Sequence, residues 1–277
     1  MAKIIIGSNT YSEYHRQDVA TDSWIHLSNE YDVDVIDLQF KDEEDQFARH
    51  YDIETVFDLE RSSRDVVDSV KKLPFISDIF KHLHKIAKER KASHFIYANS
   101  DVIVNSNLIK YINADNPTAV ACSRLDIQDV TNFQQILDKK VTPVRYEIAG
   151  LDAFVFKTEW YENNSHLFAD YLMGMPWWDQ VYASIVKLYG DNDPLGNMFP
   201  PYCFHIHHGT TWQNDKSPER GYNRDLTENS EFHRLLFKVF DNYLSSVLTK
   251  RQPYGAFMSP VKNEAEIEKK FWQSFRF

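Results

Sequence analysis

The sequence predicts an α/β fold, in which a central sheet is flanked by helices and a helical extension follows at the C-terminus. Apolar runs of strand length alternate with segments of helical periodicity through the first 160 residues, which is the pattern of a sheet covered on both faces. Helical segments then predominate after Trp160. We therefore expect one domain over residues 1–215, and a helical extension over residues 216–277 that packs on it.

The elements expected in the N-terminal part begin with a buried strand, Ile4-Ile5-Ile6, which ends in the turn Gly7-Ser8-Asn9-Thr10. A helix reaching about residue 31, a strand over 33–40 and a solvated acidic loop over 41–45 follow. Another helix opens at 60–64, is broken by Leu73-Pro74-Phe75, and gives way to an amphipathic helix over 76–90.

The later part of the chain is predicted in the same way, from periodicity and turn residues. The expected strands cover 95–98, 119–122 and 150–156, the last entered from a glycine turn at Gly150. The expected helices cover 108–113, 131–139, 160–172, 178–189, 230–249 and 263–275, with a polar linker between Gln213 and Asp225.

Charge and cysteine content exclude several classes of protein. The chain has 31 basic and 41 acidic residues, a formal net charge of -10, which argues against a general nucleic-acid binder. Two cysteines give no disulfide framework, so a reducing cytoplasm is the simpler assumption. No apolar run approaches the roughly 18 residues of a membrane span, and the N-terminus has the pattern of a strand instead of a signal peptide.

The turn Asn99-Ser100-Asp101 is the first candidate site, because it interrupts an apolar strand with a carboxylate. Ligand chemistry in α/β proteins is placed at the ends of buried strands. Local hydrogen bonding that shapes the turn is an equally good interpretation of these three residues alone.

A histidine cluster, His205, His207 and His208, is the second candidate site. Neutral imidazoles can join carboxylates in binding a metal. In a strand, His205 and His207 would point to one side and His208 to the other. A structural zinc site is disfavoured, because only Cys203 lies nearby as a further ligand.

The order of these parts resembles the GT-A class of nucleotide-sugar glycosyltransferases. The likeness covers residues 1–212 and rests on an ordered set of motifs: Leu73-Pro-Phe-Ile-Ser-Asp78, Phe95-Ile-Tyr-Ala-Asn-Ser-Asp101, Gly150-Leu-Asp-Ala-Phe-Val-Phe156, Trp178-Asp179-Gln180 and His205-Ile-His-His208. The resemblance implies a Rossmann-like mixed sheet. It also implies a divalent metal, Mn²⁺ or Mg²⁺, bound by an Asp-x-Asp turn, in which Asn99 here replaces the first carboxylate.

The resemblance assigns roles to further residues. Asp101 would bind the metal, with His205, His207 and His208 as possible partners. Asp179 would be the base that deprotonates the acceptor, although an Asp at a helix start is also a common N-cap. Asp152 would reach the donor sugar or the acceptor, with solvation at the strand edge as the alternative. The donor nucleotide and its phosphates would be bound by Thr10, Tyr11, Arg61, Arg64, Asn99, Ser100 and Asp101. Surface charges of a helix account equally well for Arg61 and Arg64.

Three function classes follow. The leading one is a glycosyltransferase of polysaccharide biosynthesis, inverting by preference, which moves a sugar from a UDP-sugar to a glycan or lipid-linked acceptor. A sugar nucleotidyltransferase and a non-catalytic binding protein on the same fold are the alternatives. We expect a cytoplasmic protein. The apolar face of the C-terminal helix (Ile267, Phe271, Phe275) would pack on its own domain, or else contact the inner face of a membrane.

Overall fold

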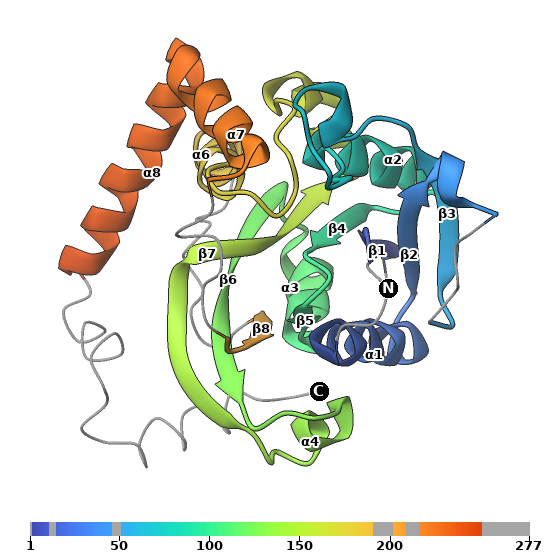
Figure 1. The fold of residues 1–277 in the computed structure, drawn as a ribbon. Helices are drawn as coiled ribbons and strands as arrows, with labels where there is room; N and C mark the ends of the chain where they lie inside the picture. Colours follow the sequence, from blue (N-terminus) through green and yellow to red (C-terminus); the bar gives the residue numbers. More distant parts are fainter. Residues whose placement is uncertain (1, 11–14, 46–50, 191–201, 209–215, 251–277) are drawn as a thin grey trace.

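The computed structural model describes residues 2–10, 15–45, 51–190, 202–208 and 216–250. These residues form a mixed sheet with helices on both faces (Figure 1). The α/β fold with a central mixed sheet, predicted from the sequence, is therefore confirmed.

Eight strands make up the sheet within the described residues, in the order β3-β2-β1-β4-β7-β6-β8-β5. They are β1 (Ile4–Ser8), β2 (Val33–Phe40), β3 (Glu54–Leu59), β4 (His94–Ala98), β5 (Val102–Val104), β6 (Ala119–Gln128), β7 (Thr142–Lys157) and β8 (Cys203–Ile206). The first four neighbours in the sheet are parallel, β7 is antiparallel to both β4 and β6, and β8 is parallel to β6 but antiparallel to β5.

The helices divide between the two faces. They are α1 (His15–Glu30), α2 (Ile76–Glu89), α3 (Ser106–Asp115), α4 (Phe133–Leu137), α5 (Thr158–Asn164), α6 (Trp178–Tyr189), α7 (Pro218–Asn229) and α8 (Glu231–Lys250). Buried residues of α1, α3 and α4 join one core cluster, and those of α2, α5, α6 and α8 join the other.

Side-chain alternation along the strands produces these two cores. Ile4 and Ile6 enter the core shared with α1, and Ile5 between them enters the core shared with α2. Trp24 of α1 is fully buried and donates its indole N–H to the carbonyl of Val102 at 3.0 Å. The start of β5, beside the candidate turn, is thereby fixed to a helix on one face.

The C-terminal helices α7 and α8 contact the segment around α6. Ser184 of α6 donates its hydroxyl hydrogen to the carbonyl of Leu236 in α8 at 2.6 Å. Asn223 of α7 accepts a hydrogen bond from the amide of Leu172 at 2.9 Å and donates one to its carbonyl at 3.0 Å. These bonds connect α7 and α8 to the segment that leads into Asp179.

The predicted helix over residues 60–72 is wrong. Only a short 3₁₀ turn, Ser63–Asp65, forms there, closed by a capping box between Ser62 and Asp65. The Ser63 hydroxyl then donates to the carbonyl of Lys71 at 2.7 Å and accepts from the amide of Leu73 at 3.0 Å. The side chains of Ser62 and Ser63 form hydrogen bonds with backbone N–H and C=O groups that would otherwise bond to each other within a helix. A folded loop therefore forms in place of the helix.

Other boundaries also differ from the prediction. Gly150 lies inside β7, not in a turn before it. Helix α5 ends at Asn164, well short of residue 172, and α7 occupies most of the predicted polar linker. Strands β3 and β5 were not expected. The helix predicted over 263–275 lies outside the described residues.

Candidate functional site

The Asn99-Ser100-Asp101 turn connects β4 to β5 and faces the histidine cluster. The turn is tight, since the amide of Val102 donates to the carbonyl of Asn99 at 2.9 Å. Strand β5 pairs with β8 so that Val102 lies opposite His205. This register brings His205 beside Asp101, and their Nε2 and Oδ2 atoms are 3.3 Å apart.

Asp101, His205 and His208 form a cluster that could hold a metal ion. One ligand atom from each lies within 4.8 Å of the others, and Nε2 of His208 is 4.0 Å from Oδ2 of Asp101. Ligands bound at ~2.1 Å to one ion lie ~3–4 Å apart, so the distances of 3.3 Å and 4.0 Å from Oδ2 of Asp101 to His205 and His208 fit a divalent metal. Burial raises the pKa of Asp101, but its hydrogen bond with His205 and the nearby Arg124 charge hold it below the ordinary value. The carboxylate is thus ionised, as a metal ligand must be.

His207 lies apart from this cluster, although the sequence grouped it with the other two histidines. Its Nδ1 is 3.3 Å from Oδ2 of Asp126, on the other side of His205. The strand alternation expected through His208 does not continue, because β8 ends at Ile206. His208 therefore turns back to the same carboxylate as His205.

Asn99 is committed to protein contacts. Its side-chain oxygen accepts from the Tyr97 hydroxyl at 2.6 Å, and its side-chain nitrogen donates to Oδ1 of Asp152 at 2.8 Å. Its backbone amide also donates to the carbonyl of Asp152 at 2.8 Å. Asn99 thus joins β4 to β7 and is not in the cluster of candidate metal ligands.

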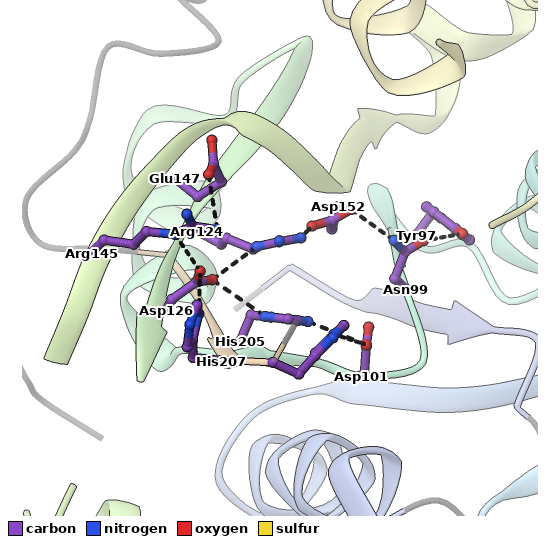
Figure 2. A network of polar contacts seen from close by, with 11 residues as sticks. Tyr97, Asn99, Asp101, Arg124, Asp126, Arg145, Glu147, Asp152, His205 and His207 are labelled. Atoms are coloured by element: carbon purple, nitrogen blue, oxygen red, sulfur yellow. Dashed lines mark hydrogen bonds and ion pairs between the residues drawn. The ribbon is translucent and has the colours of Figure 1, made fainter. Parts of the chain in front are cut away.

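A charged network continues from Asp152 to the histidines (Figure 2). Asp152 forms an ion pair with Arg124, and Nε of Arg124 lies 3.1 Å from Oδ1 of Asp126. Arg145 binds the other oxygen of Asp126 at 3.0 Å. Burial raises the pKa of Asp126, but its contacts with His205 and the two arginines hold it well below the usual range.

The sequence analysis did not identify three residues of this network as candidates, namely Arg124, Asp126 and Arg145. A signal was present, because Arg124 and Asp126 are charged residues two positions apart beside apolar residues of a strand. Such residues point to the same face of a sheet. The register of β6 against β8 was also needed to direct them to the histidines, since it sets Asp126 opposite His205.

Asp179 lies in the first turn of α6, and its expected alternative role as N-cap is wrong because Trp177 is the N-cap residue. Burial raises the pKa of Asp179 to about 6, opposed by the backbone amides of Gln180 and Leu151 and by the charge of Arg124. Since Leu151 precedes Asp152, this carboxylate lies beside the charged network. Trp178 is buried in the core and packs against Tyr97.

The predicted donor-binding residues near β1 and α2 have partners of their own. The amide of Thr10 donates to the buried Asp37 at 2.9 Å. Arg61 pairs with Asp78 at 2.5 Å and with Asp170 at 2.7 Å, and Arg64 donates to the carbonyl of Val70 at 2.9 Å. Tyr11 lies outside the described residues. These contacts do not link Arg61 or Arg64 to the Asp101 cluster, so their donor-binding role stays a prediction.

Comparisons with known proteins give distant structural likenesses. No protein-family model and no curated protein matches the sequence. Residues 1–349 of S. aureus TarS resemble it with a TM-score of 0.38 and 11% identity over 98% of this chain and 80% of that one. A longer S. aureus TarS chain gives a TM-score of 0.41 and 12% identity over 99% of this chain and 49% of that one.

The galactosyltransferase LgtC, in complex with donor and acceptor sugar analogs, gives a TM-score of 0.32 and 12% identity over 86% of this chain and 95% of that one. With TM-scores below 0.5, these likenesses do not decide what the chain does, so its function has to be inferred from the site. Among the described residues, no helix combines the length and the apolar character that crossing a membrane requires.

Proposed function

We propose that the protein is a metal-assisted glycosyltransferase of the GT-A class, which transfers a sugar from a nucleoside-diphosphate donor to an acceptor hydroxyl. The observation that carries the proposal is the cluster of Asp101, His205 and His208, together with the carboxylate of Asp179, whose pKa is raised to about 6. The charge of Arg124 acts on both Asp101 and Asp179. The cluster of one carboxylate and two imidazoles is suited to binding a cation, and Asp179 is suited to accepting a proton near neutral pH.

Asp101, His205 and His208 would hold the metal, Mn²⁺ or Mg²⁺. A bound cation would offset the charge that a nucleoside diphosphate gathers as it leaves the sugar. Two imidazoles and one carboxylate favour a transition metal over Mg²⁺, because Mg²⁺ prefers oxygen ligands. Mn²⁺ is therefore the first choice for this donor set.

Asp179 is the better candidate for the base than Asp152. The Asp152 carboxylate is paired with Arg124 and accepts from Asn99, so both contacts stabilise it as an anion and weaken it as a base. Burial has the opposite effect on Asp179 and brings its pKa close to the working pH. A base at Asp179 that removes the proton of the acceptor hydroxyl implies direct displacement with inversion, and Asp152 would then orient the donor sugar or the acceptor.

The finer assignments belong to the same proposal. We expect a UDP-sugar donor and a glycan or lipid-linked acceptor, as in polysaccharide biosynthesis. Thr10 and Tyr11 would contact the nucleotide, and Arg61 and Arg64 its phosphates, after leaving their present partners. We keep residues 1–215 as the catalytic domain and 216–277 as its helical extension, in a cytoplasmic protein.

The test is nucleotide release from a panel of nucleotide sugars with Mn²⁺. Wild-type protein should release nucleoside diphosphate from at least one donor. Asp101→Asn should lower this rate by ~100-fold or more, because the metal loses its only carboxylate in the cluster. Asp115→Asn, which alters an exposed carboxylate at the end of α3, is the matched control and should keep the wild-type rate.

Three outcomes would contradict the proposal. Equal rates for wild type and Asp101→Asn would exclude the metal cluster from the reaction. Release of pyrophosphate from a nucleoside triphosphate and a sugar phosphate would instead identify a nucleotidyltransferase. Donor binding in calorimetry without turnover, for every donor and acceptor mixture tried, would leave a non-catalytic binding protein.

A further inference from the structure

Asp126 is a buried carboxylate near the end of β6 that contacts His205 of the candidate metal cluster. Its side chain is 1% exposed. Nε of Arg124 lies 3.1 Å from Oδ1, and Nε of Arg145 lies 3.0 Å from Oδ2. Two guanidinium groups on separate strands thus hold the carboxylate in one orientation, and the same two oxygens face His205 and His207.

His205 lies between two carboxylates. Its Nε2 is 3.3 Å from Oδ2 of Asp101, and its Nδ1 is 3.3 Å from Oδ1 of Asp126. The ring is buried, and among the described residues Nδ1 has no hydrogen bond of standard geometry, so Asp126 is the acceptor within reach. A neutral imidazole carries one N–H, and its other nitrogen is the one that binds a metal.

We propose that Asp126 is a positioning residue, which accepts the Nδ1–H of His205 and so directs the lone pair of Nε2 toward Asp101 and the metal. The inference rests on the proposed function in one respect, namely that Asp101, His205 and His208 bind a metal. A carboxylate behind a ligating histidine fixes both the tautomer and the ring orientation, and its loss usually weakens metal binding ~10–100-fold.

A competing role for Asp126 is charge compensation alone. In that case it would neutralise Arg124 and Arg145 and leave His205 unaffected. A longer carboxylate at this position distinguishes the two roles, because it can compensate charge but cannot position His205. Glu at position 126 keeps the charge for the arginines, but one extra methylene moves the carboxylate away from its position opposite His205.

The first experiment measures Mn²⁺ affinity by calorimetry and electron paramagnetic resonance, without any donor. Asp126→Asn and Asp126→Glu should both bind Mn²⁺ ~10–100-fold more weakly than wild type. Asp126→Glu should also retain more of the wild-type melting temperature than Asp126→Asn. Asp138→Asn, which alters an exposed carboxylate just after α4, should keep the wild-type Mn²⁺ affinity.

The second experiment reads the histidine tautomer and needs no metal and no variant at position 126. In ¹⁵N-histidine-labelled wild-type protein at pH 8.5, where an ordinary imidazole is neutral, long-range ¹H–¹⁵N correlations report which nitrogen carries the proton. The signals of His205 are those lost in His205→Gln. We expect a protonated Nδ1 and an unprotonated Nε2.

The outcomes separate this inference from the proposed function. Unchanged Mn²⁺ affinity in folded Asp126→Asn or Asp126→Glu would overturn the positioning role and leave the metal site standing. A proton on Nε2 of wild-type His205 would overturn it even if neither variant folds. Wild-type protein that binds no Mn²⁺ would overturn the metal site itself and, with it, the effect assigned to Asp126.

Discussion

The contacts of Asn99 explain why an amide, and not a carboxylate, is suited to this position in the turn. The side-chain nitrogen donates to Oδ1 of Asp152 at 2.8 Å, which a carboxylate cannot do. The side-chain oxygen meanwhile accepts from Tyr97. An aspartate here would retain the second contact but face Asp152 with a like charge.

Asn99→Asp should therefore destabilise the fold instead of restoring a metal ligand. We expect a loss of ~1–3 kcal/mol in the free energy of unfolding at pH 7.5, because two carboxylates then share one site without the bridging hydrogen bond. Repulsion raises the pKa of one of them in the folded state, so the loss should shrink as the pH falls and that group binds a proton. Urea unfolding at pH 7.5 and pH 5 measures this, and a variant as stable as wild type at both pH values would contradict it.

Asp179 gives a prediction that couples activity to stability. With a folded pKa of about 6 and an unfolded value of ~3.9, it binds a proton more tightly in the native state. The stability it contributes is present below the unfolded value and is lost as the pH rises through the folded one. Asp179→Asn should thus gain ~1–2 kcal/mol over wild type at pH 7.5, and almost nothing at pH 3.5.

The same substitution should lower kcat ~10²–10⁴-fold if Asp179 is the base. Wild-type activity should also fall below about pH 6, as the carboxyl becomes protonated. Initial rates from pH 5 to 8, measured beside chemical unfolding, check both effects. A less stable or fully active variant would reject the assignment, and Glu159→Gln, which alters an exposed carboxylate in α5, serves as the control.

At the scale of elements, the sequence predicted correctly the strands and helices that have a clear local hydrophobic pattern. The predictions were wrong where strand pairing or side-chain hydrogen bonds determine the structure. The strand over Val33–Phe40 was predicted with its observed bounds, and the helix over 76–90 differs from α2 by one residue. Strand β3 was not predicted, because it is a half-exposed strand at the sheet edge and its sequence does not alternate clearly between apolar and polar residues. The length of β7 depends on pairing with β6 at long range, which overrides the turn signal of Gly150.

Gly150 in β7 serves packing, since a Cβ there would lie 3.1 Å from Cζ of Arg124 and 2.8 Å from Cγ of Glu147. Gly150→Ala should push the Arg124 guanidinium away from Asp152. Because both neighbours are flexible side chains, we expect a loss of ~1 kcal/mol or less in stability but a clear fall in kcat. Transfer rates and urea unfolding separate these two effects.

Gly221→Ala provides the matched control in α7. Apart from its chain neighbours and the backbone of its own helix, no described atom lies within 4 Å of its added Cβ, and the position is helical. It should therefore stabilise the protein by ~0.5–1 kcal/mol and leave kcat unchanged. Equal effects of the two substitutions on kcat would show that the Gly150 contact with Arg124 has no part in the reaction.

At the scale of the whole molecule, the site exists because the sheet brings together segments that are about a hundred residues apart. Asp101 and the histidines were predicted as candidates, since each stands at the end of an apolar run. Their distance could not be predicted, because it depends on β5 pairing with β8. The role of Asp126 could not be predicted for the same reason, because the register of β6 against β8 is what places it opposite His205.

A metal bound by the proposed cluster would link distant parts of the chain, so its binding should stabilise the whole fold. Free Mn²⁺ at 100 times its Kd should add ~2.7 kcal/mol to the free energy of unfolding, because the ligands are assembled only in the native state. The same concentration of Mg²⁺ should add less, given two imidazoles in the donor set. Thermal unfolding across a Mn²⁺ titration measures the effect, with Asp101→Asn expected to show no shift and exposed His166→Asn the full wild-type shift. An equal shift in Asp101→Asn would place the cation elsewhere on the molecule.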